Sequence, residues 1–405
     1  MAIAQVTAVI HGQTYTLTYN STTRRYEAVV PVLETSHHQP GGYFNASVTA
    51  TNDSGVSAST DGGNLPGLRL VTREITTPTI ALLSPAAGFV TNNRPMVTLD
   101  LLDEAGGSGI DLATLSIAID GLPGGITTQA ITGGYRASWT PTNPLSEGRH
   151  SLTVSVQDYD GNRASFSAQY VVDTVPPELY VDGYRQIVDA DSILVSGTVR
   201  DVTSPPVVLT VGGVTVPTDS YGHFETMVPL AIGENHIPVI VTDQAGLSST
   251  KSLYAIRLIT DRTRADVDRL LYSMAAQTMS PEPNHRGAYN YTDLNRVTIA
   301  AAFLAGELLR RGYLNPYQPI YPAPDRTEWL PSDIPTLTQM QTYADNISRT
   351  HKTLASEAPT PPRDLQRLTY QGANDMERVL VCVEAVFPWL DKSYVMAGEA
   401  MCGEF

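Results

Sequence analysis

Acidic side chains are concentrated in two turn regions between residues 100 and 160. One region holds Asp100, Asp103, Glu104 and Asp111, and the other holds Asp158 and Asp160. Proteins bind Ca²⁺ through carboxylate and carbonyl oxygens. If the turns meet at one pole of a domain, they predict a calcium site with Asp103, Asp111, Asp158 and Asp160 as ligands. Asp before Gly is also ordinary turn chemistry, because its side chain accepts a hydrogen bond from a nearby backbone N–H. We favour the turn interpretation and expect neither a metal nor another cofactor.

Three further carboxylates lie in segments with helical periodicity and are the candidates for acid–base chemistry: Glu307, Asp375 and Glu377. A peptidoglycan-cleaving enzyme needs such a group in a cleft with a shifted pKa. No H-E-x-x-H, G-x-S-x-G or P-loop motif accompanies them in the sequence. We therefore interpret them as solvated side chains or helix-cap partners, and we predict a protein without catalytic activity.

Tyrosines are interleaved with prolines in residues 313–322, where Tyr313, Tyr317 and Tyr321 occur. Aromatic rings with a polar tip offer a rigid contact area, so this segment is a candidate for binding a sugar or a partner protein. The alternative is an extended loop that packs on its own helices. We favour the loop, and no other ligand-binding residue is indicated.

The composition excludes several functional classes. The chain has 405 residues and a formal net charge of -15, a sign that repels nucleic acid and anionic membranes. Its longest apolar stretch, residues 297–309, falls short of the ~20 residues of a membrane span. The N-terminus lacks the basic segment of a secretory signal, which predicts synthesis in the cytoplasm. The two cysteines, Cys382 and Cys402, are expected to be separate thiols.

One eight-residue block recurs three times and predicts repeated β modules. Its copies are Val48–Gly55, Val154–Gly161 and Val239–Gly246, and each has a glycine six residues upstream. The copies lie about one sandwich domain apart. Prolines at residues 76–78 and 173–177 indicate short, stiff linkers. We predict three Ig-like all-β sandwiches in tandem, at residues 1–75, 76–174 and 175–259.

Apolar residues at helical spacing predict a separate, mainly α-helical domain at residues 260–405. Its helices are expected over residues 264–277, over 292–312, and after Thr336 and Thr369, where short polar side chains can cap them. Each of the last three carries an apolar stripe that should face the core: Leu294, Val297, Ala301, Leu304 and Leu308 in the second, Leu337, Met340, Ala344 and Ile347 in the third, and Ala373, Met376, Leu380, Val383 and Phe387 in the fourth. Pro388 is expected to kink or end the last helix.

Two sets of residues resemble known families. The Asp173–Pro177 linker and the V-x-D-x-x-G strand end resemble bacterial Ig-like modules of surface and virion proteins. Four segments of the helical domain resemble tail-associated proteins of phages encoded as prophages in Gram-positive bacteria. These segments are Gly287–Val297, Trp329–Thr336, Leu368–Arg378 and Ala397–Glu404.

The second resemblance implies a structural virion protein of the phage tail, baseplate or fibre. It implies other tail proteins as partners, and contact with a host-surface glycan or protein. Because tail parts assemble around rotational symmetry, we also expect a homo-oligomer. A bacterial cell-surface adhesin is the first alternative, and a tail-associated peptidoglycan-degrading enzyme is the second.

Overall fold

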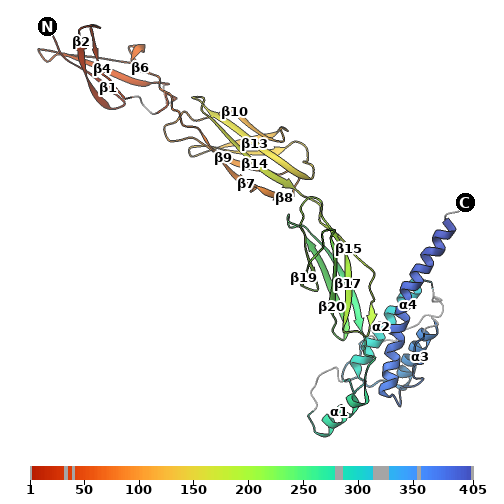
Figure 1. Cartoon of the computed structure of the whole chain (residues 1–405). Coiled ribbons are helices and arrows are strands. Elements are labelled where there is room, and N and C mark those ends of the chain that lie inside the picture. The colour runs from red at the N-terminus through yellow and green to blue at the C-terminus, as the bar shows by residue number, and fades with distance from the viewer. Residues whose placement is uncertain are drawn as a thin grey trace. The chain divides into compact units, whose positions relative to one another are not determined.

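The computed structural model describes residues 2–31, 35–38, 42–278, 286–312, 328–353 and 357–402, apart from the side chains of residues 353 and 392–402. The chain forms two compact units, and Figure 1 labels their strands and helices. The first contains residues 1–175 and 202–204, and the second contains residues 176–201 and 205–405. Among the described residues, no helix has the length and apolar character needed to cross a membrane.

The first 75 residues form one sheet of six strands in the order β3-β2-β1-β4-β5, with β6 paired to β4. The strands are β1 (Ile3–Ile10), β2 (Gln13–Asn20), β3 (Arg25–Glu27), β4 (Phe44–Asn52), β5 (Ser57–Asp61) and β6 (Arg69–Leu70), with a 3₁₀ turn at Pro66–Leu68. Only Val6, Ala8 and Ala46 are buried apolar residues in its described part. The predicted sandwich at residues 1–75 is therefore not confirmed. β3 pairs with β2 through Tyr19 and Tyr26, so it widens this sheet and does not start a second one.

The next module is a sandwich of two four-stranded sheets, ordered β10-β13-β14-β8 and β11-β12-β9-β7. Its strands are β7 (Thr79–Ser84), β8 (Gly88–Val90), β9 (Val97–Leu102), β10 (Ile110–Ile119), β11 (Gly124–Ile131), β12 (Gly134–Pro141), β13 (Gly148–Asp158) and β14 (Arg163–Val172). Alternate residues of β9 and β13 are buried, as expected when one face of a strand packs on a core. Trp139 and Tyr170, both fully buried, fill that core.

The third module has sheets ordered β15-β17-β20 and β16-β22-β21-β18-β19. Its strands are β15 (Glu178–Val181), β16 (Ile187–Val188), β17 (Ser192–Arg200), β18 (Val208–Val211), β19 (Val214–Val216), β20 (His223–Pro229), β21 (Gly233–Thr242) and β22 (Ser248–Arg257). Its core includes Val195, Val239 and Phe224. These two modules confirm the predicted Ig-like sandwiches in tandem.

Four helices follow: α1 (Arg264–Ala275), α2 (Tyr291–Arg310), α3 (Leu337–Thr353) and α4 (Tyr370–Cys402). Capping explains where they begin. Thr263 and Asp266 form a reciprocal capping box at α1, and Asn290 and Asp293 form another at α2. The hydroxyl of Thr336 accepts a hydrogen bond from the backbone N–H of Gln339 at α3. All four helices lie close to their predicted positions.

Helix α4 does not end at Pro388 but continues to Cys402 with the proline inside it. Proline removes the hydrogen bond to the carbonyl four residues earlier. The residues before it are held by packing, because Leu380, Val383 and Phe387 are all buried. Of the two outcomes expected at Pro388, a kink or an end, the structure excludes the end, because α4 continues past the proline.

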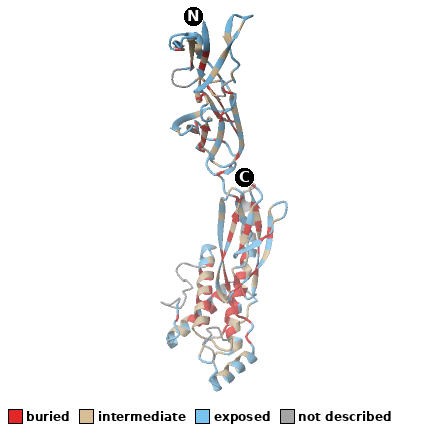
Figure 2. Ribbon diagram, turned by 90° about the vertical axis from the view of Figure 1, so that its left-hand side faces the viewer, coloured by how far each residue is buried: buried red, intermediate tan, exposed pale blue. Residues whose placement is uncertain are grey.

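The helices share their core with the third module. Ile187 of β16, together with Ile256 and Leu258 at the end of β22, packs in the same cluster as Val297, Leu304 and Met376 of the helices. Figure 2 shows this buried interior in red within the helical part. Strand residues thus complete the core of the helical region, which the sequence pattern predicts as a domain of its own from residue 260.

Polar contacts strengthen the same joint. The Nε atom of Arg185 lies 2.9 Å from the Oε2 atom of Glu384 in α4, and its Nη2 donates to the carbonyl of Val381 at 2.9 Å. The backbone N–H of Gln186 donates to the other oxygen of Glu384 at 2.7 Å. The third module and α4 are therefore joined by apolar packing and by the hydrogen bonds of the buried Glu384 carboxylate.

Candidate functional site

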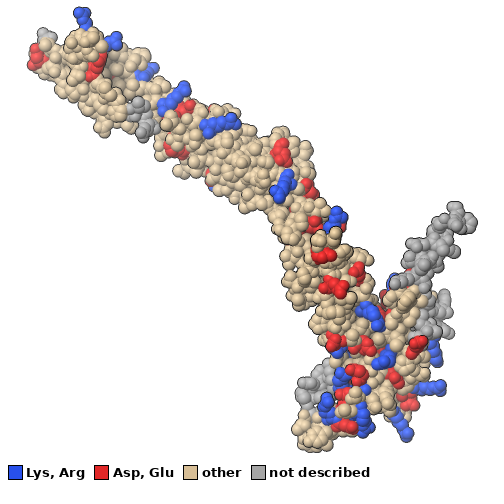
Figure 3. Space-filling view, in the orientation of Figure 1, with Lys and Arg blue, Asp and Glu red and all other residues tan. Residues whose placement is uncertain are grey.

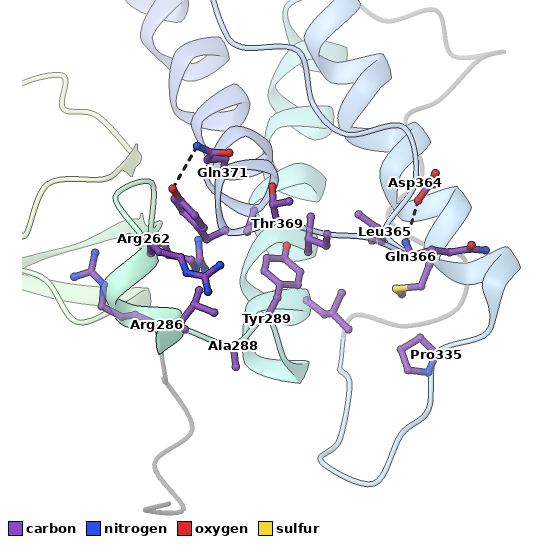
Figure 4. A pocket seen from close by; sticks show the side chains of 18 of the residues that line it. Arg262, Arg286, Ala288, Tyr289, Pro335, Asp364, Leu365, Gln366, Thr369 and Gln371 are labelled. Atoms are coloured by element: carbon purple, nitrogen blue, oxygen red, sulfur yellow. Dashed lines mark hydrogen bonds between the residues drawn. The ribbon is translucent and has the colours of Figure 1, made fainter. Parts of the chain in front are cut away.

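A groove of about 870 Å³ opens on the helical part of the second unit. It lies between α1, the segment before α2, the start of α3 and the segment before α4 (Figure 4). Apolar side chains such as Leu294, Met340 and Leu365 line it, together with Arg264, Arg286 and three glutamines. The groove therefore combines apolar and polar surface.

The wall of the groove at Arg262 rests on a buried ion network. The Nη2 atom of Arg262 lies 2.6 Å from Oε1 of Glu377 and 2.8 Å from Oδ1 of Asp293. Arg296 contacts the same two carboxylates, at 2.7 Å and 2.5 Å. Glu377 also accepts a hydrogen bond from the backbone N–H of Ile259 at 2.6 Å. Two positive and two negative side chains thus balance one another away from water.

The electrostatics of this network make it structural. Burial alone lowers the pKa of Arg262 and of Arg296, but Glu377 and Asp293 outweigh that effect and raise the pKa of both guanidinium groups. Burial raises the pKa of the neighbouring hydroxyls of Tyr289 and Tyr343, which lie 2.6 Å apart. Arginines and tyrosines with raised pKa values release no proton at neutral pH.

The three carboxylates considered for acid–base chemistry do not meet in the groove, and none of them lines it. Glu377 is fully buried, so its interpretation as a solvated or capping side chain is wrong. Glu307 forms ion pairs with Arg310 and Arg311. Burial raises the pKa of Glu307, but the hydrogen bonds from these arginines outweigh it and lower the pKa. Burial raises the pKa of Asp375.

Sequence reasoning missed the partners of Glu377. A signal was present, because Asp293 and Arg296 flank the apolar positions Leu294 and Val297 on the predicted stripe of α2. Charged residues beside such a stripe are buried when the helix is enclosed on several sides. The tyrosine candidates Tyr313, Tyr317 and Tyr321 lie outside the described residues.

The acidic turns of the second module do come together in part. One carboxylate oxygen each from Asp103 and Asp158 lies within 4.8 Å of the other and of one from Glu74. Asp160 forms a neighbouring cluster with His37 and His38.

The other acidic side chains of these turns have different roles. The side chain of Asp111 accepts a hydrogen bond from the N–H of Ala113 at 3.0 Å and is not part of either cluster. Asp100 forms an ion pair with Arg136 at 2.8 Å. The calcium prediction therefore named two residues of one cluster, Asp103 and Asp158, and missed Glu74.

Electrostatic repulsion is evident in the first cluster. Burial raises the pKa of Glu74, and the negative charges of Asp158 and Asp160 raise it further. Burial also raises the pKa of Glu104, and contact with Asp103 adds to the effect. Glu74 comes from the segment after β6, before the first residue of the second module, so no motif in the module itself could indicate it.

Comparison with known proteins supports the sandwich modules. Residues 78–154 match a family model described as Bacterial Ig domain, and residues 177–257 match one described as Glucodextranase, domain B. No curated protein matches the chain. Domains of these kinds indicate a module that is extracellular or exposed on a surface.

Solved structures with similar modules are distant. The fibronectin(III)-like modules of CbhA from Clostridium thermocellum align with 15% identity over 44% of this chain and 94% of that chain, with a TM-score of 0.30. An I-band fragment of titin aligns with 12% identity over 62% and 87%, with a TM-score of 0.31. The protocadherin GammaB4 extracellular domain aligns with 16% identity over 64% and 42%, with a TM-score of 0.25.

Proposed function

We propose that this chain is a non-catalytic structural protein of a tailed-phage virion, in the tail, baseplate or fibre. Its β modules extend from the particle, and its helical part engages a neighbouring tail protein or the host surface. In this proposal the chain is made in the host cytoplasm, reaches the outside by lysis and functions as a homo-oligomer.

The observation that carries this proposal is the convergence of the phage-like segments. Gly287–Val297 supplies Asp293 and Arg296 to the buried ion network, and Leu368–Arg378 supplies Glu377. The side chain of Asn295 holds both the backbone N–H and the carbonyl of Trp329, which opens the Trp329–Thr336 segment. Three segments separated in sequence thus build one centre, as expected if they were retained together as a domain. The side chains of the fourth segment, residues 397–404, lie outside the described part.

We assign the groove to contact with the neighbouring tail protein. Apolar side chains line it, and its charged lining residues are three arginines, Arg262, Arg264 and Arg286, and one acid, Asp364. A partner segment with apolar side chains flanked by acidic ones is therefore complementary. Charged side chains lie close together on the helical part drawn in Figure 3, while they are sparse on the sheets. The helical part is therefore the better surface for specific polar recognition.

Fractionation of the producing culture tests the location. Antibodies against the chain should detect it in purified particles by immunogold labelling, and mass spectrometry should find it there in a fixed copy number. Detection in the bacterial wall fraction, and not in particles, would instead establish the adhesin alternative. Lysis in a peptidoglycan zymogram that Glu307→Gln abolishes would establish the enzyme alternative.

A pair of variants tests the groove. Leu337 lines it and is 63% exposed, whereas Ile334 is 90% exposed and lies outside it. Because both side chains reach water, Leu337→Glu and Ile334→Glu should both fold. Only Leu337→Glu should reduce incorporation of the chain into particles. Equal incorporation of the two variants would exclude the groove as the contact.

A further inference from the structure

The acidic cluster at the junction of the first sheet and the second module has the features of a cation site. We propose that Glu74, Asp103 and Asp158 bind one Ca²⁺ ion. Glu74 follows β6, Asp103 follows β9, and Asp158 ends β13. The ion would therefore join the segment that ends the first sheet to two loops of the second module.

The spacing of the oxygens fits one ion. Each of the three residues offers a carboxylate oxygen within 4.8 Å of the others. Ca²⁺–oxygen distances are about 2.3–2.6 Å, so two ligands of the same ion lie at most about 5 Å apart. The three carboxylates surround a point that a single ion can reach.

Burial without compensation is the second argument. Glu74 is 4% exposed and Asp158 is 2% exposed. In the described part of the chain, no Lys or Arg forms an ion pair with any of the three. Buried charges are normally paired or bind a metal. Glu74 and Asp158 are thus buried with neutral hydrogen-bond donors alone, and the partly buried Asp103 lies beside them.

The hydrogen bonds leave one oxygen for a ligand. The Oδ2 atom of Asp103 accepts from the N–H of Gly109 at 2.6 Å, and Glu74 accepts from Ser108 and Asn162. The Oδ1 atom of Asp103 is buried and has no hydrogen-bond partner among the described residues. A buried carboxylate oxygen without a donor is destabilising, and a bound cation removes that cost.

The third module repeats two of the three acidic positions. Asp201 follows β17 as Asp103 follows β9, and Asp243 follows β21 as Asp158 ends β13. Asp243 accepts from the N–H four residues later at 2.9 Å, as Asp158 does. The Oδ2 atom of Asp243 is also buried without a hydrogen-bond partner. The two acidic positions are thus a repeated feature of the modules, beyond the local chemistry of one turn.

The ligand chemistry selects the metal. All donors are oxygens, which favours a hard cation over zinc or copper. Three carboxylates in an irregular arrangement suit the flexible coordination of Ca²⁺ better than the strict octahedron of Mg²⁺. Calcium binding would clamp the first sheet, which has a small apolar core of its own, to the second module.

Calorimetric titration of the full-length, EDTA-treated chain with CaCl₂ tests the site. The test variant is Asp103→Asn, and the matched control is Asp111→Asn, an acidic residue nearby in the sequence that is outside the cluster. We expect the wild type and the control to bind Ca²⁺ alike. Asp103→Asn should bind one ion fewer, or bind it at least tenfold more weakly.

A melting experiment separates a metal ligand from a structural side chain. In EDTA, Asp103→Asn should melt at the wild-type temperature or higher, because it removes repulsion. In millimolar CaCl₂ it should melt lower than the wild type, whose transition Ca²⁺ raises. A wild type that neither binds Ca²⁺ nor shifts its transition would overturn the proposal. An Asp103→Asn variant that binds as many Ca²⁺ ions as the wild type with the same affinity would overturn it too. So would a variant that melts at a lower temperature than the wild type in EDTA.

Discussion

Arg262 and Glu377 form a buried ion pair, 2.6 Å from Nη2 to Oε1, between the end of the third module and helix α4. Their side chains are 2% and 0% exposed. Because Asp293 and Arg296 complete the network, removal of one member leaves an uncompensated charge away from water. This pair makes the helical part dependent on a residue that precedes its first helix.

The substitution Glu377→Gln should lower the free energy of unfolding of the second unit by about 3 kcal/mol. The reason is that removing one carboxylate from a buried ion network leaves a positive charge of Arg262 or Arg296 without a counter-charge. Urea unfolding followed by helical circular dichroism measures it. The control Glu307→Gln, whose carboxylate is at the surface, should cost under about 1 kcal/mol. Equal losses for the two variants would contradict the structural role of the network.

Acid should weaken the ion pairs at the C-terminal end of α2. The pKa values of Glu307 and Asp391 are both lowered in the folded chain. For Asp391 the largest cause is the hydrogen bond from Arg311. For Glu307 burial raises the pKa, but the hydrogen bonds from Arg310 and Arg311 outweigh that effect. A lowered folded-state pKa adds stability above the unfolded value of about 4.3 for Glu, and that stability is lost as pH falls through the folded pKa.

Melting temperatures of the wild type and of Glu307→Gln, measured from pH 7 down to pH 3, check this. The variant should be less stable at pH 7 by about 0.5–1 kcal/mol, and the two curves should converge at low pH. Curves that remain parallel over this range would show that Glu307 is not the titrating group.

The third module and the helices should unfold together. Ile187 is fully buried in the core that they share, so Ile187→Ala should cost about 2–4 kcal/mol. Strand and helix signals should then shift together in calorimetry and circular dichroism. Leu99→Ala, in the core of the second module, should leave the helical transition in place. Separate melting of the helices in the Ile187 variant would contradict a shared core.

Two glycines of the helical part should respond to alanine in opposite directions. A Cβ atom at Gly287 would lie 2.3 Å from the carbonyl oxygen of Asp266, whereas one at Gly306 inside α2 meets nothing within 4 Å. Gly287→Ala should therefore destabilise the helical part. Gly306→Ala should stabilise it by about 0.5–1 kcal/mol, because alanine loses less entropy in a helix. Thermal melts of the two variants, each compared with the wild type, measure whether the melting temperature falls for Gly287→Ala and rises for Gly306→Ala.

The repeated block could be predicted because glycine and alternation leave direct marks in a sequence. Its three copies lie at β4, β13 and β21 with the turns that follow. The closing glycines Gly55, Gly161 and Gly246 all have φ between 80° and 95°, a region that side chains with a Cβ rarely enter. The upstream glycines also have positive φ. Each glycine therefore marked a chain reversal at the correct end of a strand.

Long-range partners could not be predicted in the same way. The stripe Ala373, Met376, Leu380, Val383 and Phe387 is entirely buried as predicted. The burial of Glu377 beside it depends on arginines about 80 and 115 residues away in sequence. Leu337 belongs to a predicted stripe yet is 63% exposed, because it borders the groove. Periodicity states which face is apolar, but it does not state what covers that face.

The shared core also determines how the groove can move. A domain on a flexible linker samples many orientations, and its binding surface points wherever thermal motion carries it. Here Ile187, Leu258 and the Arg185–Glu384 contact attach the helices to a sheet. The orientation of the groove is therefore set by the third module. Any partner that binds the groove also fixes the orientation of that module relative to itself.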